Sequence, residues 1–300
     1  MQKVAVILSV FIPSLLLLFW GFPSKTVVLE LRLPELLLSF GFGGSLAAAG
    51  GVFQGALKNP LAEPYTLGTA AGAALGAALA SVSGFSVELG ALFGGLFSVL
   101  LIVLSFRVFS DPLSVLLFGV GLTAFFSAAV LFLYALFPVY TLEEALLFTL
   151  GYITPVKVSL SLFLFTVSLL FLVLLTVRSR SLDLISLGDE TAFFSGVDPK
   201  RERFLLLFIS SVPVSLFVAC CGVIGFVGIV VPHAVRFLGY RTGKFLLPVS
   251  FLLGGGALTL SQWLARTLLY PTVLPAGVVT ALLGVPLFLY ILWRYTGVRG

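Results

Sequence analysis

Residues 43–77 read GGSLAAAGGVFQGALKNPLAEPYTLGTAAGAALGA. Two stretches of glycine, alanine and larger apolar residues flank a short segment that contains Asn, Pro and the only two charges, Lys58 and Glu63. Helices with this many small residues can approach one another closely, which is how helices associate inside a bilayer. The stretch therefore predicts two tightly packed membrane helices joined by a proline-containing segment.

The rest of the 300-residue chain has the same character. Apolar residues make up 60% and charged residues 10% of it, and its mean hydropathy is +1.20, whereas a soluble domain is only about half apolar. Its apolar stretches are continuous, which excludes an outer-membrane barrel of short alternating strands. At about 20 residues per span, the chain fits a single transmembrane domain over residues 1–300. We expect an all-α polytopic membrane protein with about ten transmembrane helices.

Charges, glycines and prolines bound the predicted spans, which cover residues 4–22, 36–56, 67–82, 88–106, 112–137, 158–177, 204–221, 224–240, 245–265 and 277–293. If residue 1 is cytoplasmic, thirteen of the 17 basic residues fall on the cytoplasmic side: Lys3, Lys58, Arg107, Arg178, Arg180, Lys200, Arg201, Arg203, Arg236, Arg241, Lys244, Arg294 and Arg299. This asymmetry predicts a multi-pass protein of the cytoplasmic (inner) membrane with both termini in the cytoplasm. The basic residues are scattered singly through a bilayer-embedded chain, which argues against nucleic acid as a partner.

The longest charged segment is residues 178–203, predicted to be a cytoplasmic loop. It contains ten charged residues: Arg178, Arg180, Asp183, Asp189, Glu190, Asp198, Lys200, Arg201, Glu202 and Arg203. Within it, residues 186–196 begin with polar residues, carry two acids where the first turn of a helix would lie, and end on glycine. A short amphipathic helix on the cytoplasmic face explains Phe193 and Phe194, which would otherwise be exposed without a partner. A merely solvated connector is the alternative.

A weak internal repeat relates the second and seventh predicted spans. Gly51-Val52 aligns with Gly222-Val223, and Pro60 then aligns with Pro232. Five crossings separate the two copies, so they would run in opposite directions, as in the inverted repeats of transporters. Chance is an equal explanation, because Gly and Pro are frequent in membrane helices.

Residues for catalysis, metal binding or ion coupling are missing from the predicted spans. We find no ionisable side chain near the centre of an apolar stretch, which disfavours an ion-coupled carrier. A single histidine, His233, cannot form a metal site, and the neighbouring Cys220 and Cys221 are expected to be packing residues. Residues 239–245, GYRTGKF, have the wrong spacing for a phosphate-binding loop, so the chain is not expected to be an ATPase. An intramembrane hydrolase using Ser45 and His233 is a remote alternative.

Three blocks of the sequence resemble the ABC importer permeases for ferric siderophores, haem and cobalamin. The first is LRLP at 31–34 followed by residues 43–77, the second is GVIGFVGIVVPHAVRFLGY at 222–240, and the third is LPAGVVTALLGVPLFLYIL at 274–292. A Leu-Gly-x-Glu-x-Ala element begins at Leu187 and lies between the first and second blocks. The family-motif residues that match are Arg32, Pro34, Gln54, Asn59, Pro60, Gly68, Gly228, Pro232, His233, Arg236, Pro275, Gly277 and Pro286.

The resemblance implies a permease that works as a homodimer or heterodimer, with a homodimer expected. Its implied partners are two cytoplasmic ATP-binding subunits, which would hold ATP and Mg²⁺, and an extracytoplasmic substrate-binding protein. Residues 178–203 are implied to be the coupling loop that docks on the ATPase. The coupling residues would be Leu187, Gly188, Asp189, Glu190, Ala192, Phe193 and Gly196.

Four positions depart from the family pattern. Val273 stands where an acid often precedes Leu-Pro, and Phe148 stands where a tryptophan commonly precedes Gly151 by three residues. Glu35 stands where the family usually has an arginine, and Gln262 stands where an aspartate commonly precedes Arg266 by four residues. We expect the reversed charge at Glu35 to reshape a contact on the outer face. We expect Gln262 to be a neutral replacement that avoids burying a charge.

The sequence thus predicts the transmembrane permease of a type II ABC importer, which moves a large iron chelate or corrinoid without changing it chemically. A ferric siderophore is the first candidate for the cargo. Haem, cobalamin and oxyanions such as molybdate are alternatives within the same class, because the motifs are shared among these permeases.

Overall fold

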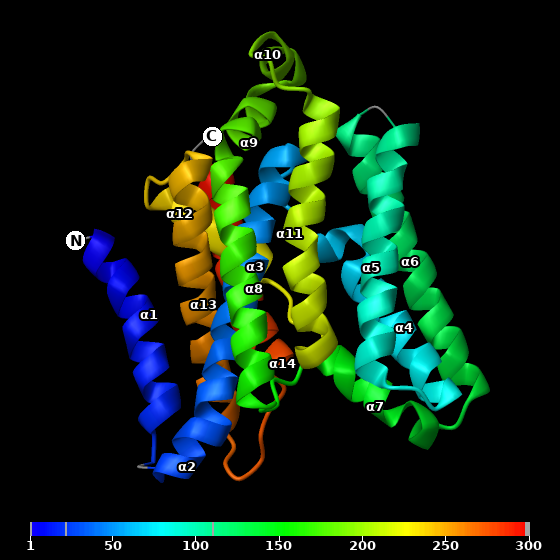
Figure 1. Cartoon of the computed structure of the whole chain (residues 1–300), viewed down its shortest axis with the longest axis vertical. Coiled ribbons are helices and arrows are strands. Elements are labelled where there is room, and N and C mark those ends of the chain that lie inside the picture. Colours follow the sequence, from blue (N-terminus) through cyan, green and yellow to red (C-terminus); the bar gives the residue numbers. More distant parts are fainter. Residues whose placement is uncertain (1, 22, 110, 298–300) are drawn as a thin grey trace.

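The computed structural model describes residues 2–21, 23–109 and 111–297, and within them all regular structure is helical (Figure 1). Arg299, which was counted on the cytoplasmic side, lies outside the described residues. The elements are α1 (Gln2–Phe19), α2 (Lys25–Val27), the π-helix η1 (Val28–Arg32), α3 (Leu33–Ala56), the 3₁₀ turn η2 (Pro64–Leu67), α4 (Thr69–Ser83), α5 (Val87–Val108), α6 (Pro112–Leu136), α7 (Val139–Leu150), α8 (Val158–Val177), α9 (Ser179–Leu187), α10 (Asp189–Phe194), α11 (Pro199–Cys221), α12 (Val227–Phe237), α13 (Gly243–Thr267) and α14 (Ala276–Gly297).

Among the described residues, six helical segments are long and apolar enough to cross a membrane, and four further apolar helices are shorter. Each of the ten predicted spans overlaps one of these helices, and α8 covers the predicted range 158–177. Length and composition alone support this agreement, so the count of ten spans stays a prediction.

Helix α11 begins before its predicted start at residue 204. The Asp198 carboxylate accepts hydrogen bonds from the backbone N–H groups of Lys200 and Arg201, and Pro199 occupies the first turn. Such a cap allows a charged first turn that a search for apolar runs does not detect. As a result Arg203 lies inside the helix, where its side chain is 1% exposed.

Helix α7 was missed by the sequence analysis. Its twelve residues are too few for a span, and Glu143 and Glu144 interrupt their apolar pattern. In Figure 1 it lies at the end of the molecule opposite to α10.

The core of the molecule is α3, which packs against α13, α8, α11 and α12. Nearly every residue of α3 from Gly41 to Gln54 is buried. A Cβ atom placed on Gly43 would collide with the backbone carbonyl of Gly254 in α13, and one on Gly50 with that of Gly228 in α12. The glycines therefore allow backbone-to-backbone contact, and the predicted close approach of small-residue helices is confirmed.

Helices α4 and α5 also make backbone-to-backbone contact at glycines. Gly72 faces Gly94, and Gly76 faces Gly90, with carbonyl oxygens where a methyl group would otherwise sit. Because two helices can lie this close only where both lack side chains, the glycines set the register of the pair.

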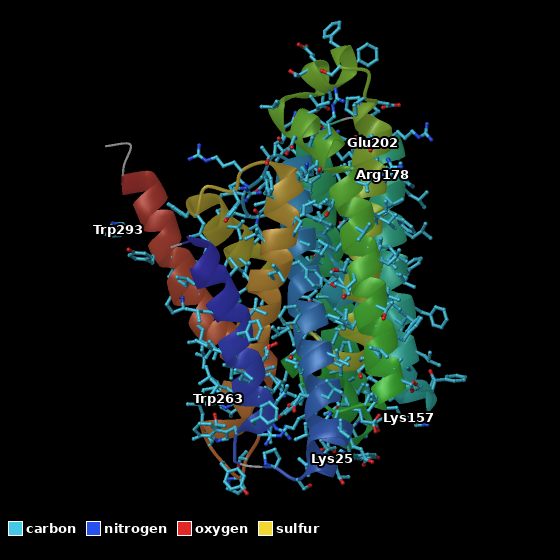
Figure 2. The ribbon with its side chains drawn as sticks, turned by 60° about the vertical axis from the view of Figure 1, so that its left-hand side comes forward. Lys25, Lys157, Arg178, Glu202, Trp263 and Trp293 are labelled. Atoms are coloured by element: carbon cyan, nitrogen blue, oxygen red, sulfur yellow. The ribbon has the colours of Figure 1, made fainter. Side chains whose placement is uncertain are left out.

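Charged side chains mark the two ends of the bundle. Lys25 and Lys157 lie at one end, whereas Arg178 and Glu202 lie at the other and form an ion pair of 2.7 Å (Figure 2). Helix α11 runs opposite to α3 (Figure 1), the direction that an inverted repeat requires. The aligned glycines differ in role, because Gly51 lies within α3 whereas Gly222 ends α11 with a φ of +71°.

Near the Lys25 end, a buried polar cluster ties α3 to α13. Glu35 is 1% exposed and accepts hydrogen bonds from the side chains of Gln262 and Arg266. Gln262 also donates to the carbonyl oxygen of Ile153 at 3.2 Å. The expectation that Glu35 makes an outer-face contact is therefore wrong, because its side chain points into the bundle.

Glu35 and Gln262, two of the positions that depart from the family pattern, are in direct contact. Gln262 does not avoid a buried charge, since the carboxylate that it lacks is supplied by Glu35 across the helix interface. Arg266 thereby keeps an acidic partner although the residue four positions before it is neutral.

We expect Glu35→Gln to lower the free energy of unfolding by about 2 kcal/mol. Removing one member of a buried ion pair leaves the other charge without a partner and costs about 3–5 kcal/mol. We expect a smaller loss here because the Arg266 side chain keeps some contact with solvent. The midpoint of thermal unfolding in detergent, followed by tryptophan fluorescence, measures the loss.

The exposed Glu144→Gln is the matched control and should leave that midpoint unchanged. Glu35→Arg combined with Gln262→Asp should recover most of the stability, because it restores an acid–base pair. A double variant no more stable than Glu35→Gln would contradict the coupling of these positions.

Candidate functional site

Helix α10 stands at the tip of the molecule, beyond the ends of the long helices (Figure 1). Gly188 separates it from α9 with a φ of +153°, a backbone conformation that favours glycine. The predicted short helix is thus present. Ala192 faces inward and is fully buried, whereas Phe193 and Phe194 are 68% and 85% exposed. Two adjacent exposed phenylalanines at a helix tip form an apolar surface suited to a partner protein.

An ion-pair cluster fastens α10 to the bundle. The Asp189 carboxylate accepts hydrogen bonds from Lys58 at 2.7 Å and from Arg203 at 2.8 Å. Arg203 also donates from Nε to the carbonyl oxygen of Ala56, at the end of α3, at 2.8 Å. Burial would raise the pKa of Asp189, but hydrogen bonds and charges from Arg203 and Lys58 hold it below its ordinary value. Asp189 is therefore ionised at neutral pH.

A second polar contact joins α3 to α12. The Gln54 amide donates to the carbonyl oxygens of Gly228 and Ile229, each at 3.3 Å. Its amide oxygen accepts a hydrogen bond from Arg236. The Nδ1 atom of His233 lies 2.8 Å from the carbonyl oxygen of Ile229, so its proton is on that nitrogen. This hydrogen bond spans four residues within α12.

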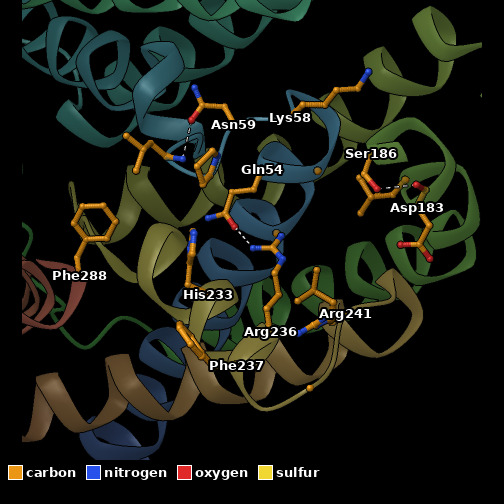
Figure 3. Close-up of a pocket in the computed structure, with 17 residues that line it drawn as sticks. Gln54, Lys58, Asn59, Asp183, Ser186, His233, Arg236, Phe237, Arg241 and Phe288 are labelled. Carbon is orange, nitrogen blue, oxygen red and sulfur yellow. Dashed lines mark hydrogen bonds between the residues drawn. The ribbon is translucent and has the colours of Figure 1, made fainter. Parts of the chain in front are cut away.

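A cavity of about 760 Å³ lies between α3, α9, α12 and α14 (Figure 3). Five of the sequence-predicted motif residues line it, namely Gln54, Asn59, Pro60, His233 and Arg236. The other lining residues are Gly51, Gly55, Lys58, Leu61, Leu182, Asp183, Ser186, Phe237, Gly239, Arg241, Leu246 and Phe288. The Asn59 side chain accepts a hydrogen bond from the backbone N–H of Leu61 at 2.8 Å, which shapes the turn after α3.

The other motif residues lie elsewhere and serve packing. Pro34 opens α3 near the opposite end, and Arg32 beside it donates to the carbonyl oxygen of Leu17 at 3.1 Å. Gly277 donates to the carbonyl oxygen of Gly151 at 3.0 Å, and a Cβ on it would meet two carbonyl oxygens. Gly68 has a φ of +90°. Pro232 and Pro286 lie inside α12 and α14, and Pro275 comes just before α14.

Sequence reasoning missed several polar residues of this region. Lys58 was counted only as a loop charge, yet it pairs with Asp189 and has a positive φ of 51°. Arg203 was placed at the end of the predicted cytoplasmic loop, yet it lies inside α11 and its side chain is buried. Glu63 is 6% exposed, and its Oε2 atom has no hydrogen-bond partner among the described residues. The sequence did hold a signal for Lys58 and Glu63, since they are the only two charged residues in the stretch 43–77.

No group of three or more His, Cys, Asp or Glu side chains in the described part of the chain could hold a metal ion. Cys221 is buried and Cys220 half-buried, and both are free thiols.

Known proteins are similar in sequence to this chain over nearly its whole length. The FecCD transport family matches residues 4–294. The hemin transport system permease HmuU of Yersinia pestis is 35% identical over 276 residues, which cover 89% of this chain and 83% of that protein. The Fe(3+) dicitrate transport system permease FecD of Escherichia coli K12 is 36% identical over 279 residues, which cover 91% and 87%.

Solved structures share the fold. One described as an inward-facing metal-chelate type ABC transporter has a TM-score of 0.89 at 30% identity, covering 97% of this chain and 98% of its own. PsaBC from Streptococcus pneumoniae has a TM-score of 0.60 at 18% identity, which shows the fold alone. Long apolar helices and permease relatives together make this a multi-pass protein of the inner membrane, and its family consists of permease subunits and not of enzymes. The chain belongs to the FecCD transport family and is the transmembrane permease subunit of an ABC importer.

Proposed function

We propose that this permease imports a large iron chelate, with a ferric siderophore as the first candidate. Its relatives are named for hemin and for Fe(3+) dicitrate, which supports an iron compound as cargo. Haem, cobalamin and molybdate are the alternatives within the same importer class. An ion-coupled carrier is not supported, because the solved structure that this chain matches at 30% identity is described as an ABC transporter.

The partners follow from the family, which implies ATP-binding subunits and a substrate-binding protein. The chain would pair with a second copy of itself, and two cytoplasmic ATP-binding subunits would hold ATP and Mg²⁺. The end that carries α10 would face the cytoplasm together with both termini. The substrate-binding protein would then dock near Lys25 and Lys157, at the opposite end (Figure 2).

The exposed side chains of Phe193 and Phe194 support the proposed docking of the ATP-binding subunits. These side chains lie at the tip of α10, the short helix of the predicted coupling loop, on a helix whose buried face and ion pairs hold it firmly to the bundle. A rigid apolar tip inserted into a groove of the ATPase would transmit force, because a push on it cannot be absorbed by bending a loop.

The ion pairs of Asp189 determine which parts of the permease a displacement of α10 would move. Through Arg203, α10 is joined to the last turn of α3, and through Lys58 to the turn that lines the cavity. A displacement of α10 on ATP binding would therefore move the cavity wall as well as the helix bundle. Closure and reopening of the ATPases would thus change which side of the membrane the pathway faces.

We expect the complex, reconstituted with its ATP-binding subunits and binding protein, to show ATP-driven uptake of a ferric siderophore. Phe193→Asp with Phe194→Asp should abolish binding of the ATP-binding subunits, because it puts two charges into an apolar contact. Co-purification and ATP-dependent uptake in proteoliposomes are the measurements.

Phe85→Asp is the matched control, since this phenylalanine is also exposed but lies outside the coupling loop, after α4. Uptake driven by an ion gradient without ATP-binding subunits would overturn the proposal.

We expect Lys58→Gln and Asp189→Asn each to lower the amount of chelate imported per ATP hydrolysed by roughly threefold to tenfold, which lies within the effect of about 0.5–2 kcal/mol that mutations between two coupled sites have. The double variant should be little worse than Asp189→Asn alone, because that variant already removes the contact with Lys58 as well as the one with Arg203.

Lys200→Gln, an exposed charge in the same loop, should leave the ratio unchanged. Additive losses in the double variant, or an unchanged ratio in both single variants, would contradict the assigned role of the pair.

A further inference from the structure

The cavity between α3, α9, α12 and α14 has the size of a small-molecule site. Its volume of about 760 Å³ lies within the usual range for ligand pockets, about 300–1,000 Å³. Its walls combine polar side chains from α3 and α12 with the aromatic rings of Phe237 and Phe288 (Figure 3). Mixed walls of this kind suit a ligand that has both an apolar body and polar groups.

The lining is positively charged. Lys58, Arg236 and Arg241 line the cavity, against a single acid, Asp183. Asp183 accepts a hydrogen bond from the backbone N–H of Gly243 at 2.8 Å. Burial raises the pKa of the Asp183 carboxyl, and that backbone hydrogen bond opposes the rise. Lys58 is paired with Asp189 outside the lining, and among the described residues neither Arg236 nor Arg241 forms an ion pair.

Arg236 is better suited than Arg241 to bind an anion because its side chain is half-buried and held in place. Its guanidinium donates to the Gln54 amide oxygen, and the Gln54 amide is itself fixed by two backbone carbonyls of α12. No carboxylate lies within 4.0 Å of Arg236 among the described residues. A half-buried cation ordinarily has an anionic partner, and the guanidinium has five N–H donors for one neutral acceptor here.

Arg241 and His233 lie around the same space (Figure 3). Arg241 is exposed and has no ionic partner in the described part of the chain. His233 uses Nδ1 for the carbonyl oxygen of Ile229, so its Nε2 atom is not needed by the helix. An anionic group in the cavity would therefore find one preorganised guanidinium and a second, adaptable one.

We propose that this cavity is an anion-binding site that receives the carboxylates of a negatively charged iron chelate. The assignment rests on the proposed import of an iron chelate and adds a requirement to it, namely that the cargo carries negative charge. Arg236 binds the anionic group, and Gln54 is the positioning residue that aims the guanidinium. A carboxylate or phosphate shares this chemistry, so the headgroup of an anionic lipid is the competing occupant that the test must separate.

The test measures binding to the permease with its ATP-binding subunits in nanodiscs of phosphatidylcholine. The probes are ferric citrate, which is anionic, and a neutral ferric trihydroxamate. We expect Arg236→Lys and Arg241→Gln each to weaken binding of ferric citrate by about tenfold, as expected for a lost charge-assisted hydrogen bond. Binding of the neutral chelate should stay within about twofold.

Lys244→Gln is the matched control, because Lys244 is an exposed cation near Arg241 that does not line the cavity. Equal loss in this control, or unchanged affinity for ferric citrate in both arginine variants, would overturn the site. So would displacement of ferric citrate when phosphatidylglycerol replaces part of the phosphatidylcholine, since the cavity would then be a lipid site.

ATP-driven uptake in the same nanodisc-derived complex, after transfer to proteoliposomes, separates the two proposals. If the unmodified complex imports a ferric chelate while the arginine variants bind ferric citrate normally, only the anion site is lost. If the unmodified complex imports no iron chelate, the proposed function fails and the cargo assignment of the cavity fails with it.

Discussion

Contact between glycine backbones is the constraint on which the rest of this molecule depends. Gly43 meets Gly254, and Gly50 meets Gly228, at distances that leave no room for a methyl group. Within a bilayer, lipid tails are as apolar as leucine, so no hydrophobic force brings helices together and close van der Waals contact must do so. The glycines make that contact possible along much of α3, and they fix how α12 and α13 lie beside it.

With α3 enclosed in this way, its charged contacts lie at its two ends, and the hydroxyl groups of Ser39 and Thr259 form a further buried hydrogen bond of 3.2 Å. At one end Glu35 joins α13 through Gln262 and Arg266. At the other, the buried Arg203 donates to the Ala56 carbonyl oxygen, one of the carbonyls that the end of any helix leaves without a partner. The helix is therefore held laterally by packing and at its ends by charge. Such an element moves as a rigid unit, which is what coupling between distant faces requires.

The turn after α3 is where the two functional parts meet. Lys58 contacts Asp189 of the predicted coupling helix, and the next residues, Asn59 and Pro60, line the cavity. The proposed docking of a partner at Phe193 and Phe194 and the proposed occupancy of the cavity would thus act on the same few residues of backbone. The cation of Arg236 faces this space with only Gln54 as its partner among the described residues.

The amino-acid sequence by itself determined the membrane class, the all-helical fold, most helix boundaries to within a few residues, the close packing of the small-residue helices and a short helix within residues 186–196. These follow from hydrophobic length, glycine spacing and capping residues, which are local properties of the chain. Only the tertiary structure decided which polar side chains pair. Gln262 and Glu35 are 227 positions apart, Arg236 and Gln54 are 182 apart, and Lys58 and Asp189 are 131 apart. Such pairings depend on how helices rotate and cross, which packing of the whole bundle settles.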